Sequence, residues 1–256
     1  MELHFFKYEG AENTFVLIED YSLSFPAHPS IISYLCDSKK GIGADGILLL
    51  QPSRHATIKM KIFNQDGTEA TTCGNGLRCA AKHLARPFCH IETHSGISHA
   101  IVSNSLIQVS LPFCKIIRPS LHLPYGLMGS LVYSGTPHLV IFVHDLYQPE
   151  LFSTCMQLKK MHTNLGRGIN VNLAKITRNA IFVRSFEKGI AEETFSCGSG
   201  GGAVSLLYCY KYQKNHALIS FMRSSLLFFL DKKKLLWMQG PARQILRGTI
   251  SILSTK

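Results

Sequence analysis

The chain has no long hydrophobic run, since no segment approaches the roughly 18 uninterrupted apolar residues that indicate a membrane-spanning helix. Residues 1–10 carry charges and aromatics and lack the apolar stretch of a secretion signal. Low-complexity tracts are missing as well. We therefore expect a cytoplasmic protein with no membrane partner, and the 256 residues suffice for two domains, each with its own core.

Metal and disulfide signatures are also missing. The sequence has 8 cysteines but no C-x-x-C, and the two nearest, Cys73 and Cys79, are too far apart for that spacing. Eight cysteines in 256 residues are too few for a disulfide scaffold. We expect reduced thiols and no metal site.

Nucleotide signatures are incomplete. No G-x-x-x-x-G-K-[ST] occurs, and Gly41–Gly46 matches G-x-G-x-x-G but leads into a strand-like run, the reverse of the order in a dinucleotide fold. Residues 198–203 match the variant of this motif that ends in alanine and open a helical run, but no acid lies at 218–222. The net charge of +11 comes from dispersed lysines and arginines without interleaved aromatics, so we expect a solvated basic surface and no nucleic-acid partner.

What the chain does contain is a repeated phrase. The sequence CGNG at 73–76 returns as CGSG at 197–200, 124 residues later (197 − 73). Glu69 and Glu193 each precede the cysteine by four positions, and Tyr8-Glu9-Gly10 parallels Tyr133-Ser134-Gly135. A period this long, seen twice, indicates two homologous lobes rather than a solenoid.

Each repeated cysteine lies where a strand-like stretch gives way to glycines and a helical run. We therefore expect both thiols at helix N-termini, where the helix dipole lowers a thiol pKa. Further helices are expected over 29–39 and 151–162. Strands are expected from β-branched or alternating runs; the clearest are 15–18, 47–50, 58–63, 101–111, 139–143, 181–183, 226–230 and 250–252.

Paired thiols restrict the chemistry. No papain-like or caspase-like signature accompanies the cysteines, and a thiol oxidoreductase usually has its two cysteines close in sequence. The remaining option places a carbon acid between the thiols, so that one thiolate removes a proton from one face and the other thiol returns one to the opposite face. That is cofactor-independent racemisation or epimerisation. Free N–H groups at the two helix ends would bind the negative charge that develops on a carboxylate.

These residues resemble the diaminopimelate epimerase family over nearly the whole chain. The resemblance rests on eight segments: 13–16 (NTFV), 41–46 (GIGADG), 63–69 (FNQDGTE), 73–79 (CGNGLRC), 135–138 (GTPH), 169–172 (INVN), 187–189 (EKG) and 193–200 (ETFSCGSG). It implies an α+β fold of two pseudo-symmetric lobes, each a β-barrel-like sheet wrapped around a central helix. The lobes would span 1–117 and 118–247, with a C-terminal strand, 248–256, returning to the first lobe and the active site in the cleft between them.

The resemblance also implies residue roles. Cys73 and Cys197 would be the acid/base pair, with the reacting carboxylate held by Gly74, Asn75, Gly198 and Ser199. Contacts to the rest of the substrate would come from Asn13, Asn64, Asn170, Glu187 and Lys188. His138, Glu187 and Thr136 would support the site. No cofactor or metal is implied, and the substrate would be LL-diaminopimelate, a diamino dicarboxylic acid converted to its meso isomer for lysine and peptidoglycan precursors.

Several positions depart from the family pattern. Lys188 replaces the usual arginine, Thr136 the usual asparagine and Ser199 the usual threonine. A lysine is a point charge rather than a bidentate fork, so the region that recognises the distal end of the substrate is altered. We expect intact proton transfer with selectivity that could extend to glutamate.

Other readings stay open at this point. A proline or hydroxyproline racemase-like enzyme shares the fold, although its first motif normally has histidine where Asn75 stands. A non-catalytic two-lobed binding protein would not need both thiols. A homodimer is also open.

Overall fold

The computed structural model describes residues 2–103, 106–160, 162–163, 166–190, 192–194 and 196–252. The chain divides into two compact units, residues 1–110 with 240–256 and residues 111–239. No helix in the described ranges is long and apolar enough to cross a membrane.

The first unit is a sheet around one helix. Its strands pair in the order β19-β1-β2-β3-β4-β6-β7-β8, with β5 on β4. Their bounds are β1 Glu2–Gly10, β2 Asn13–Glu19, β3 Gly46–Gln51, β4 Ile58–Asn64, β5 Glu69–Ala70, β6 Phe88–Thr93, β7 Gly96–Ser103, β8 Leu106–Ser110 and β19 Arg243–Ser251. Helix α2 (Gly74–Leu84) contacts seven of these strands, from β1 to β19, and is the central helix of the unit.

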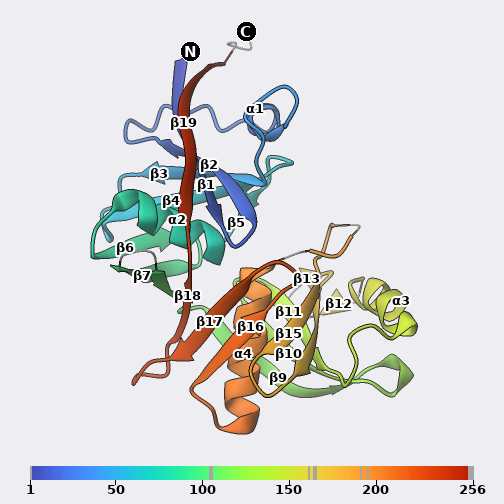
Figure 1. The fold of residues 1–256 in the computed structure, drawn as a ribbon. Coiled ribbons are helices and arrows are strands. Elements are labelled where there is room, and N and C mark those ends of the chain that lie inside the picture. The colour runs from blue at the N-terminus through green and yellow to red at the C-terminus, as the bar shows by residue number, and fades with distance from the viewer. Residues whose placement is uncertain are drawn as a thin grey trace. The chain divides into compact units, whose positions relative to one another are not determined.

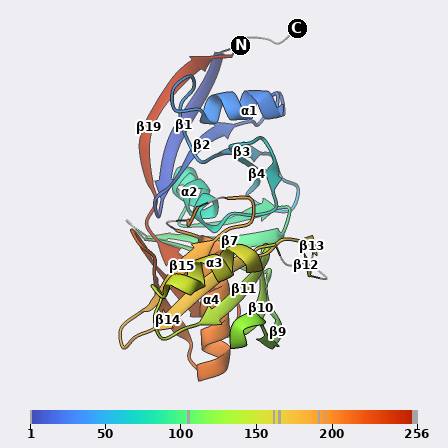
Figure 2. The same ribbon diagram turned by 90° about the vertical axis from the view of Figure 1, so that its right-hand side faces the viewer.

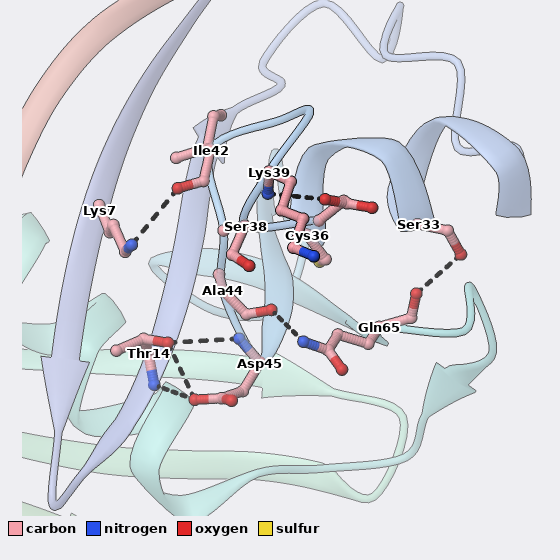
Figure 3. A pocket seen from close by; sticks show the side chains of 12 residues that line it. Lys7, Thr14, Ser33, Cys36, Ser38, Lys39, Ile42, Ala44, Asp45 and Gln65 are labelled. Carbon is pink, nitrogen blue, oxygen red and sulfur yellow. Dashed lines mark hydrogen bonds between the residues drawn. The ribbon is translucent and has the colours of Figure 1, made fainter.

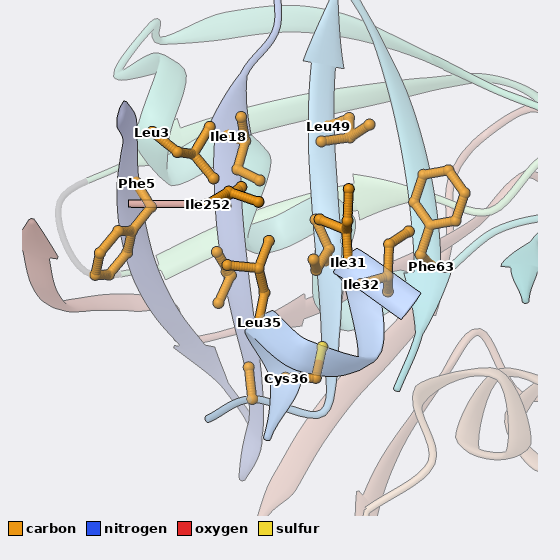
Figure 4. Close-up of a cluster of buried hydrophobic side chains, with 13 residues drawn as sticks. Leu3, Phe5, Ile18, Ile31, Ile32, Leu35, Cys36, Leu49, Phe63 and Ile252 are labelled. Atoms are coloured by element: carbon orange, nitrogen blue, oxygen red, sulfur yellow. The ribbon is translucent and has the colours of Figure 1, made fainter. Parts of the chain in front are cut away.

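A second helix covers another part of this sheet. Helix α1 (Pro29–Cys36) buries Ile31, Ile32 and Leu35 in an apolar cluster with side chains from β1 to β4 (Figure 4). Pro29 at its first position is compatible with a helix start, and the helix ends at Asp37, whose backbone is extended. The helix is therefore shorter than the expected 29–39.

The second unit repeats the arrangement. Its strands pair in the order β9-β10-β11-β14-β15-β16-β17-β18 around α4, which contacts β9, β10, β11, β14, β16 and β17. The strand bounds are β9 Cys114–His122, β10 Met128–Ser134, β11 Pro137–Phe142, β14 Asn170–Ile176, β15 Ile181–Phe186, β16 His216–Ser220, β17 Ser225–Leu230 and β18 Leu236–Gly240. The remaining elements are η1 Pro124–Gly126, α3 Pro149–Leu158, the short pair β12 His162–Thr163 and β13 Gly166–Arg167, and α4 Gly198–Tyr212.

The duplication is visible in the strand directions. In both units an antiparallel pair is followed by parallel, antiparallel, parallel and two antiparallel pairings, from β1 to β8 and from β10 to β18. Strand β19 pairs with β1 as β9 pairs with β10 (Figures 1 and 2). The returning C-terminal strand thus supplies the first unit with the element that β9 supplies to the second.

Unit boundaries differ from those expected at 117/118 and 247/248. Strand β9 starts at Cys114 and pairs with β10, so the second unit begins at Leu111, before the expected boundary. Strand β19 starts at Arg243, earlier than residue 248, because its register with β1 extends back to Glu9. Of the expected returning segment 248–256, residues 253–256 lie outside the described ranges.

Two further element predictions were wrong in detail. The run 101–111 contains a chain reversal, because Ser103 pairs with Leu106 between β7 and β8; apolar alternation on both sides concealed it. Helix α3 covers Pro149–Leu158 rather than 151–162. The other expected strands overlap observed ones, and both helices after the repeated cysteines are confirmed.

Candidate active site

Cys73 is the N-cap residue of α2. Its backbone is extended, with φ −150° and ψ 115°, and its half-buried Sγ accepts a hydrogen bond from the Gly76 amide at 3.4 Å. The thiol therefore takes the role that Ser, Thr or Asp usually has at this position. The backbone N–H groups of Gly74 and Asn75, the first two residues of the helix, donate to no acceptor among the described residues. They therefore remain available as donors at the positive end of the helix.

A buried arginine orients Asn75. Arg78 is fully buried, and its Nη2 donates to Asn75 Oδ1 at 3.0 Å while its Nε donates to the Pro241 carbonyl at 3.2 Å. A guanidinium can only donate, so Asn75 must present its oxygen to Arg78. The Asn75 Nδ2 group consequently faces away as a donor. Burial is the main cause that lowers the pKa of Arg78.

Asn13 and Asn64 lie at strand ends of the same unit. Asn13 starts β2 and pairs with Gly10, and Asn64 ends β4. Asn64 is exposed, and its Nδ2 donates to Thr68 Oγ1 at 3.0 Å. The Asn64 Oδ1 group is therefore the part of this amide that is directed away from Thr68.

Neither of these asparagines lines the pocket next to α1 in this unit. It has a volume of about 820 Å³ and lies between α1, the loop 37–45 and β2 (Figure 3). Thr14 and Gln65 line it, and they are the chain neighbours of Asn13 and Asn64. Adjacent residues of a strand point to opposite faces, so Asn13 is directed away from the pocket. The Asp45 carboxylate in the pocket wall accepts two hydrogen bonds from Thr14, one from the amide at 2.7 Å and one from the hydroxyl at 2.9 Å.

Cys197 is the N-cap residue of α4, the counterpart of Cys73. The Gly200 amide donates to its Sγ at 3.3 Å, and Ser199 Oγ lies 3.4 Å from the same sulfur. Both sequence-predicted cysteines therefore lie at helix N-termini, as expected. Gly198 is buried behind the thiol, and Ser199 is half-buried beside it.

The expectation of an acidic thiol is wrong for Cys197. Burial raises the pKa of this thiol well above its ordinary value, and the neighbouring Glu187 carboxylate raises it further. Hydrogen bonds from Ser199 and Gly200 act in the opposite direction but are outweighed. Burial also raises the pKa of Glu187. Helix-end stabilisation of a thiolate is modest, and a fully desolvated sulfur beside a carboxyl group loses more than it gains.

His138 lies behind this helix end, fully buried, and burial lowers its pKa to about 3. Its Nδ1 accepts from Asn172 Nδ2 at 3.0 Å, and its Nε2 lies 3.1 Å from Thr136 Oγ1. Asn170 Nδ2 reaches the same Thr136 oxygen at 3.0 Å, and Asn170 Oδ1 accepts from the Lys188 amide at 2.8 Å. Of the predicted residues of this unit, Thr136, His138, Asn170 and the Lys188 backbone are thus joined in one hydrogen-bonded group.

Asn172 was missed as a functional candidate. It is fully buried, accepts from Ser185 Oγ at 3.0 Å, and lies directly against Gly200. The available signal was Asn170-Val171-Asn172, because the period of two in a strand puts both amides on one face. Lys159 was also missed: it is buried, its Nζ donates to the Ile190 carbonyl, and it interacts electrostatically with Glu187.

Lys188 lies in the loop after β15. Its side chain is exposed and forms no ion pair within the described ranges. In the part of the chain that the structure describes, no group of three His, Cys, Asp or Glu side chains could hold a metal ion.

Solved structures share this fold. A hydroxyproline epimerase from Agrobacterium vitis matches with a TM-score of 0.74 at 13% identity, covering 97% of this chain and 92% of its own. A phenazine biosynthesis protein of the PhzF family from Bacillus anthracis matches with a TM-score of 0.71 at 14% identity, covering 98% and 100%. The chain therefore has an α+β two-lobed fold, in which each of two similar units has a central helix capped by a cysteine.

Sequence relatives narrow the class. The family model for diaminopimelate epimerase matches residues 5–104. The diaminopimelate epimerase of Pelotomaculum thermopropionicum is 31% identical over 276 residues, covering 96% of this chain and 98% of its own. That of Archaeoglobus fulgidus is 31% identical over 232 residues, covering 81% of each. The chain belongs to the diaminopimelate epimerase family and is an isomerase.

Proposed function

We propose that the chain epimerises LL-diaminopimelate to meso-diaminopimelate with Cys73 and Cys197 as its two acid/base groups. The observation that supports this most directly is the matched capping geometry, in which each sulfur accepts an amide hydrogen bond from the third residue of its helix. Family membership supports the substrate. Lysine and peptidoglycan precursor synthesis, in the cytoplasm, is the proposed setting.

The proposed reaction needs the two thiols on opposite faces of one α-carbon. In one direction the Cys73 thiolate takes the α-proton, and the carbanion takes a proton from the Cys197 thiol. Cys73 ends protonated and Cys197 ends as the thiolate, so the reverse direction uses the opposite pair of states. We assign the proton to Cys197 in the resting enzyme because burial and Glu187 both favour its neutral form.

Charge stabilisation is assigned to the helix ends. The carboxylate of the substrate gains charge as the α-proton leaves, and donors fixed beforehand stabilise that charge without reorganisation. The proposed donors are the amides of Gly74, Asn75, Gly198 and Ser199, with Asn75 Nδ2 oriented by Arg78. Loss of one such donor typically costs about 3–4 kcal/mol in oxyanion sites.

A steady-state assay with purified protein tests the activity. Without added pyridoxal phosphate, LL-diaminopimelate should yield the meso isomer, detected by chiral chromatography. L-Proline serves as the comparison substrate. Turnover of proline with none of diaminopimelate would overturn the proposal in favour of a proline racemase-like enzyme.

Selectivity is proposed to be relaxed toward glutamate. Lys188 presents one ammonium where a guanidinium fork would bind a carboxylate through two bonds, so less of the binding energy depends on the distal group. Glutamate should show measurable kcat/KM, and Lys188→Arg should raise the ratio of diaminopimelate to glutamate turnover. Robust diaminopimelate turnover beside no glutamate turnover would refute this part alone.

A further inference from the structure

A closed path of contacts surrounds Cys197. Gly200 joins the thiol to Asn172, which it touches, and Asn172 continues through His138 to Thr136. On the other side, Asn170 connects Thr136 to the Lys188 amide, and Glu187 next in the chain interacts with the Cys197 thiol. Thr136 is an exposed member of this path.

The proton on His138 has a defined position. Burial keeps the imidazole neutral, so only one of its nitrogens carries hydrogen. Asn172 Nδ2 can only donate and lies 3.0 Å from Nδ1, so Nδ1 is the acceptor. The hydrogen is therefore on Nε2, which donates to Thr136 Oγ1 at 3.1 Å.

The Thr136 oxygen receives a second donor. Asn170 must turn its Oδ1 toward the Lys188 amide, which can only donate, so Asn170 Nδ2 faces Thr136. A hydroxyl oxygen accepts two hydrogen bonds and donates one. Because His138 and Asn170 fill both acceptor positions of Thr136 Oγ1, the hydroxyl can only donate one further hydrogen bond. No acceptor for that hydrogen lies among the described side chains and backbone groups.

We propose that Asn172 is a positioning residue that acts through His138 to make the Thr136 hydroxyl a hydrogen-bond donor to a carboxylate oxygen of the bound amino acid. The proposal rests on the proposed function for the identity of that ligand. A hydroxyl fixed as a donor favours an anionic oxygen and offers nothing to an ammonium group. Thr136 thereby supplies a donor of its own to the bound ligand.

The first test reads the tautomer of His138 and needs no turnover. In protein labelled with ¹⁵N-histidine, the His138 resonances are identified by their loss in His138→Gln. At neutral pH they should report the Nε2–H tautomer in the wild type. In Asn172→Asp, the carboxylate accepts from Nδ1 and so should move hydrogen to Nδ1. A wild-type Nδ1–H tautomer, or an imidazolium at neutral pH, would overturn the proposal even with full epimerase activity.

Kinetics provide the second test. Thr136→Val should raise KM about tenfold or more, and raise it more than it lowers kcat, because a bond to a charged oxygen is lost. Thr136→Ser should restore most of the wild-type KM. Thr177→Val is the matched control. It removes a hydroxyl just beyond the far end of β14 that donates to the Ala180 carbonyl and accepts from the Ala180 amide, and it should leave KM unchanged.

The Asn172→Asp variant separates positioning from a merely structural role. In this variant, when the His138 imidazole is neutral, Nε2 carries no hydrogen and accepts the Thr136 hydroxyl hydrogen. That hydrogen is then no longer available to the substrate, so KM should rise as in Thr136→Val. At lower pH the imidazolium donates again from Nε2 and KM should fall, a pH dependence absent from the wild type. In Asn172→Asp, adding Thr136→Val should raise KM no further. A pH-independent KM, or full additivity, would contradict the proposal. If the wild type does not turn over diaminopimelate, the proposed function fails. The tautomer measurement still decides whether Asn172 acts on Thr136 through His138.

Discussion

Replacement of Gly200 by alanine tests the packing behind Cys197. A Cβ at this position would overlap Asn172 Oδ1 and lie 3.2 Å from Cys197 Sγ. Asn172 cannot easily withdraw, because it is fully buried and bound to both His138 and Ser185. The equivalent Cβ at Gly76 would meet Leu48 Cδ2 at 2.9 Å, the end of a flexible side chain.

The expected cost follows from these contacts. Overpacking costs about 1–3 kcal/mol, and displacement of Asn172 endangers hydrogen bonds that contribute about 1 kcal/mol each. Alanine has a higher helix propensity than glycine, which offsets this cost by up to about 1 kcal/mol. Gly200→Ala should therefore lower the free energy of unfolding by about 2–3 kcal/mol, whereas Gly76→Ala should stay within about 1 kcal/mol of the wild type, because Leu48 can move.

Differential scanning calorimetry measures the difference. A loss of 2–3 kcal/mol corresponds to a decrease in Tm of roughly 4–12 °C for a chain of this size. Asn172→Ala removes the overlapping side chain, so the double variant with Gly200→Ala should be less destabilised than the sum of the single variants. Equal stability of the two glycine variants, or strict additivity, would refute the reasoning.

Three further predictions concern buried polar groups. The pKa of His138 is lowered from 6.5 to about 3, so the folded state excludes a proton that the unfolded state binds; this stability is present above pH 6.5 and is lost as the pH falls toward 3. Urea titrations across that range should show a stability slope shallower by up to about 1.4 kcal/mol per pH unit in His138→Gln than in the wild type. Arg78→Met should cost about 2–4 kcal/mol in urea unfolding and raise KM, because Asn75 loses the donor that orients it; an unchanged KM would contradict that role. Glu193→Gln should cost about 1–2 kcal/mol, measured in the same way, because it weakens the partly buried bidentate pair with Arg184, whose Nη2 lies 2.7 Å from Oε2; a stability equal to the wild type would show that the pair is dispensable.

The sequence predicts those parts of the fold where local pattern and tertiary packing agree. Runs such as 47–50 are β-branched or apolar and form β3, buried at the centre of its unit. Strand β19 is mostly exposed and lacks apolar alternation, so the residue pattern indicated only its C-terminal end, near 250–252. Strand β9 contains Pro119, which has no amide hydrogen to donate to a neighbouring strand, so local sequence gives little sign of this strand.

The site shows the same division. Helix-capping cysteines follow from local sequence, because the glycines and the helical run are adjacent in the chain. The raised pKa of Cys197 depends on burial and on Glu187, which the fold of β15 and the following loop brings to the thiol. The role of Asn172 depends on the parallel pairing of β11 with β14, which aligns His138 with Asn170. Long-range pairing of this kind leaves no mark in a single sequence.

Isotope incorporation tests the central claim, a proton relay between Cys73 and Cys197, most directly. LL-diaminopimelate incubated in heavy water without pyridoxal phosphate should yield meso product with deuterium at the inverted α-carbon. Cys73→Ala and Cys197→Ala should each abolish epimerisation, while a cysteine outside the relay, Cys89→Ala, should retain it. Undiminished turnover in either relay variant, or product without deuterium, would contradict the two-base account.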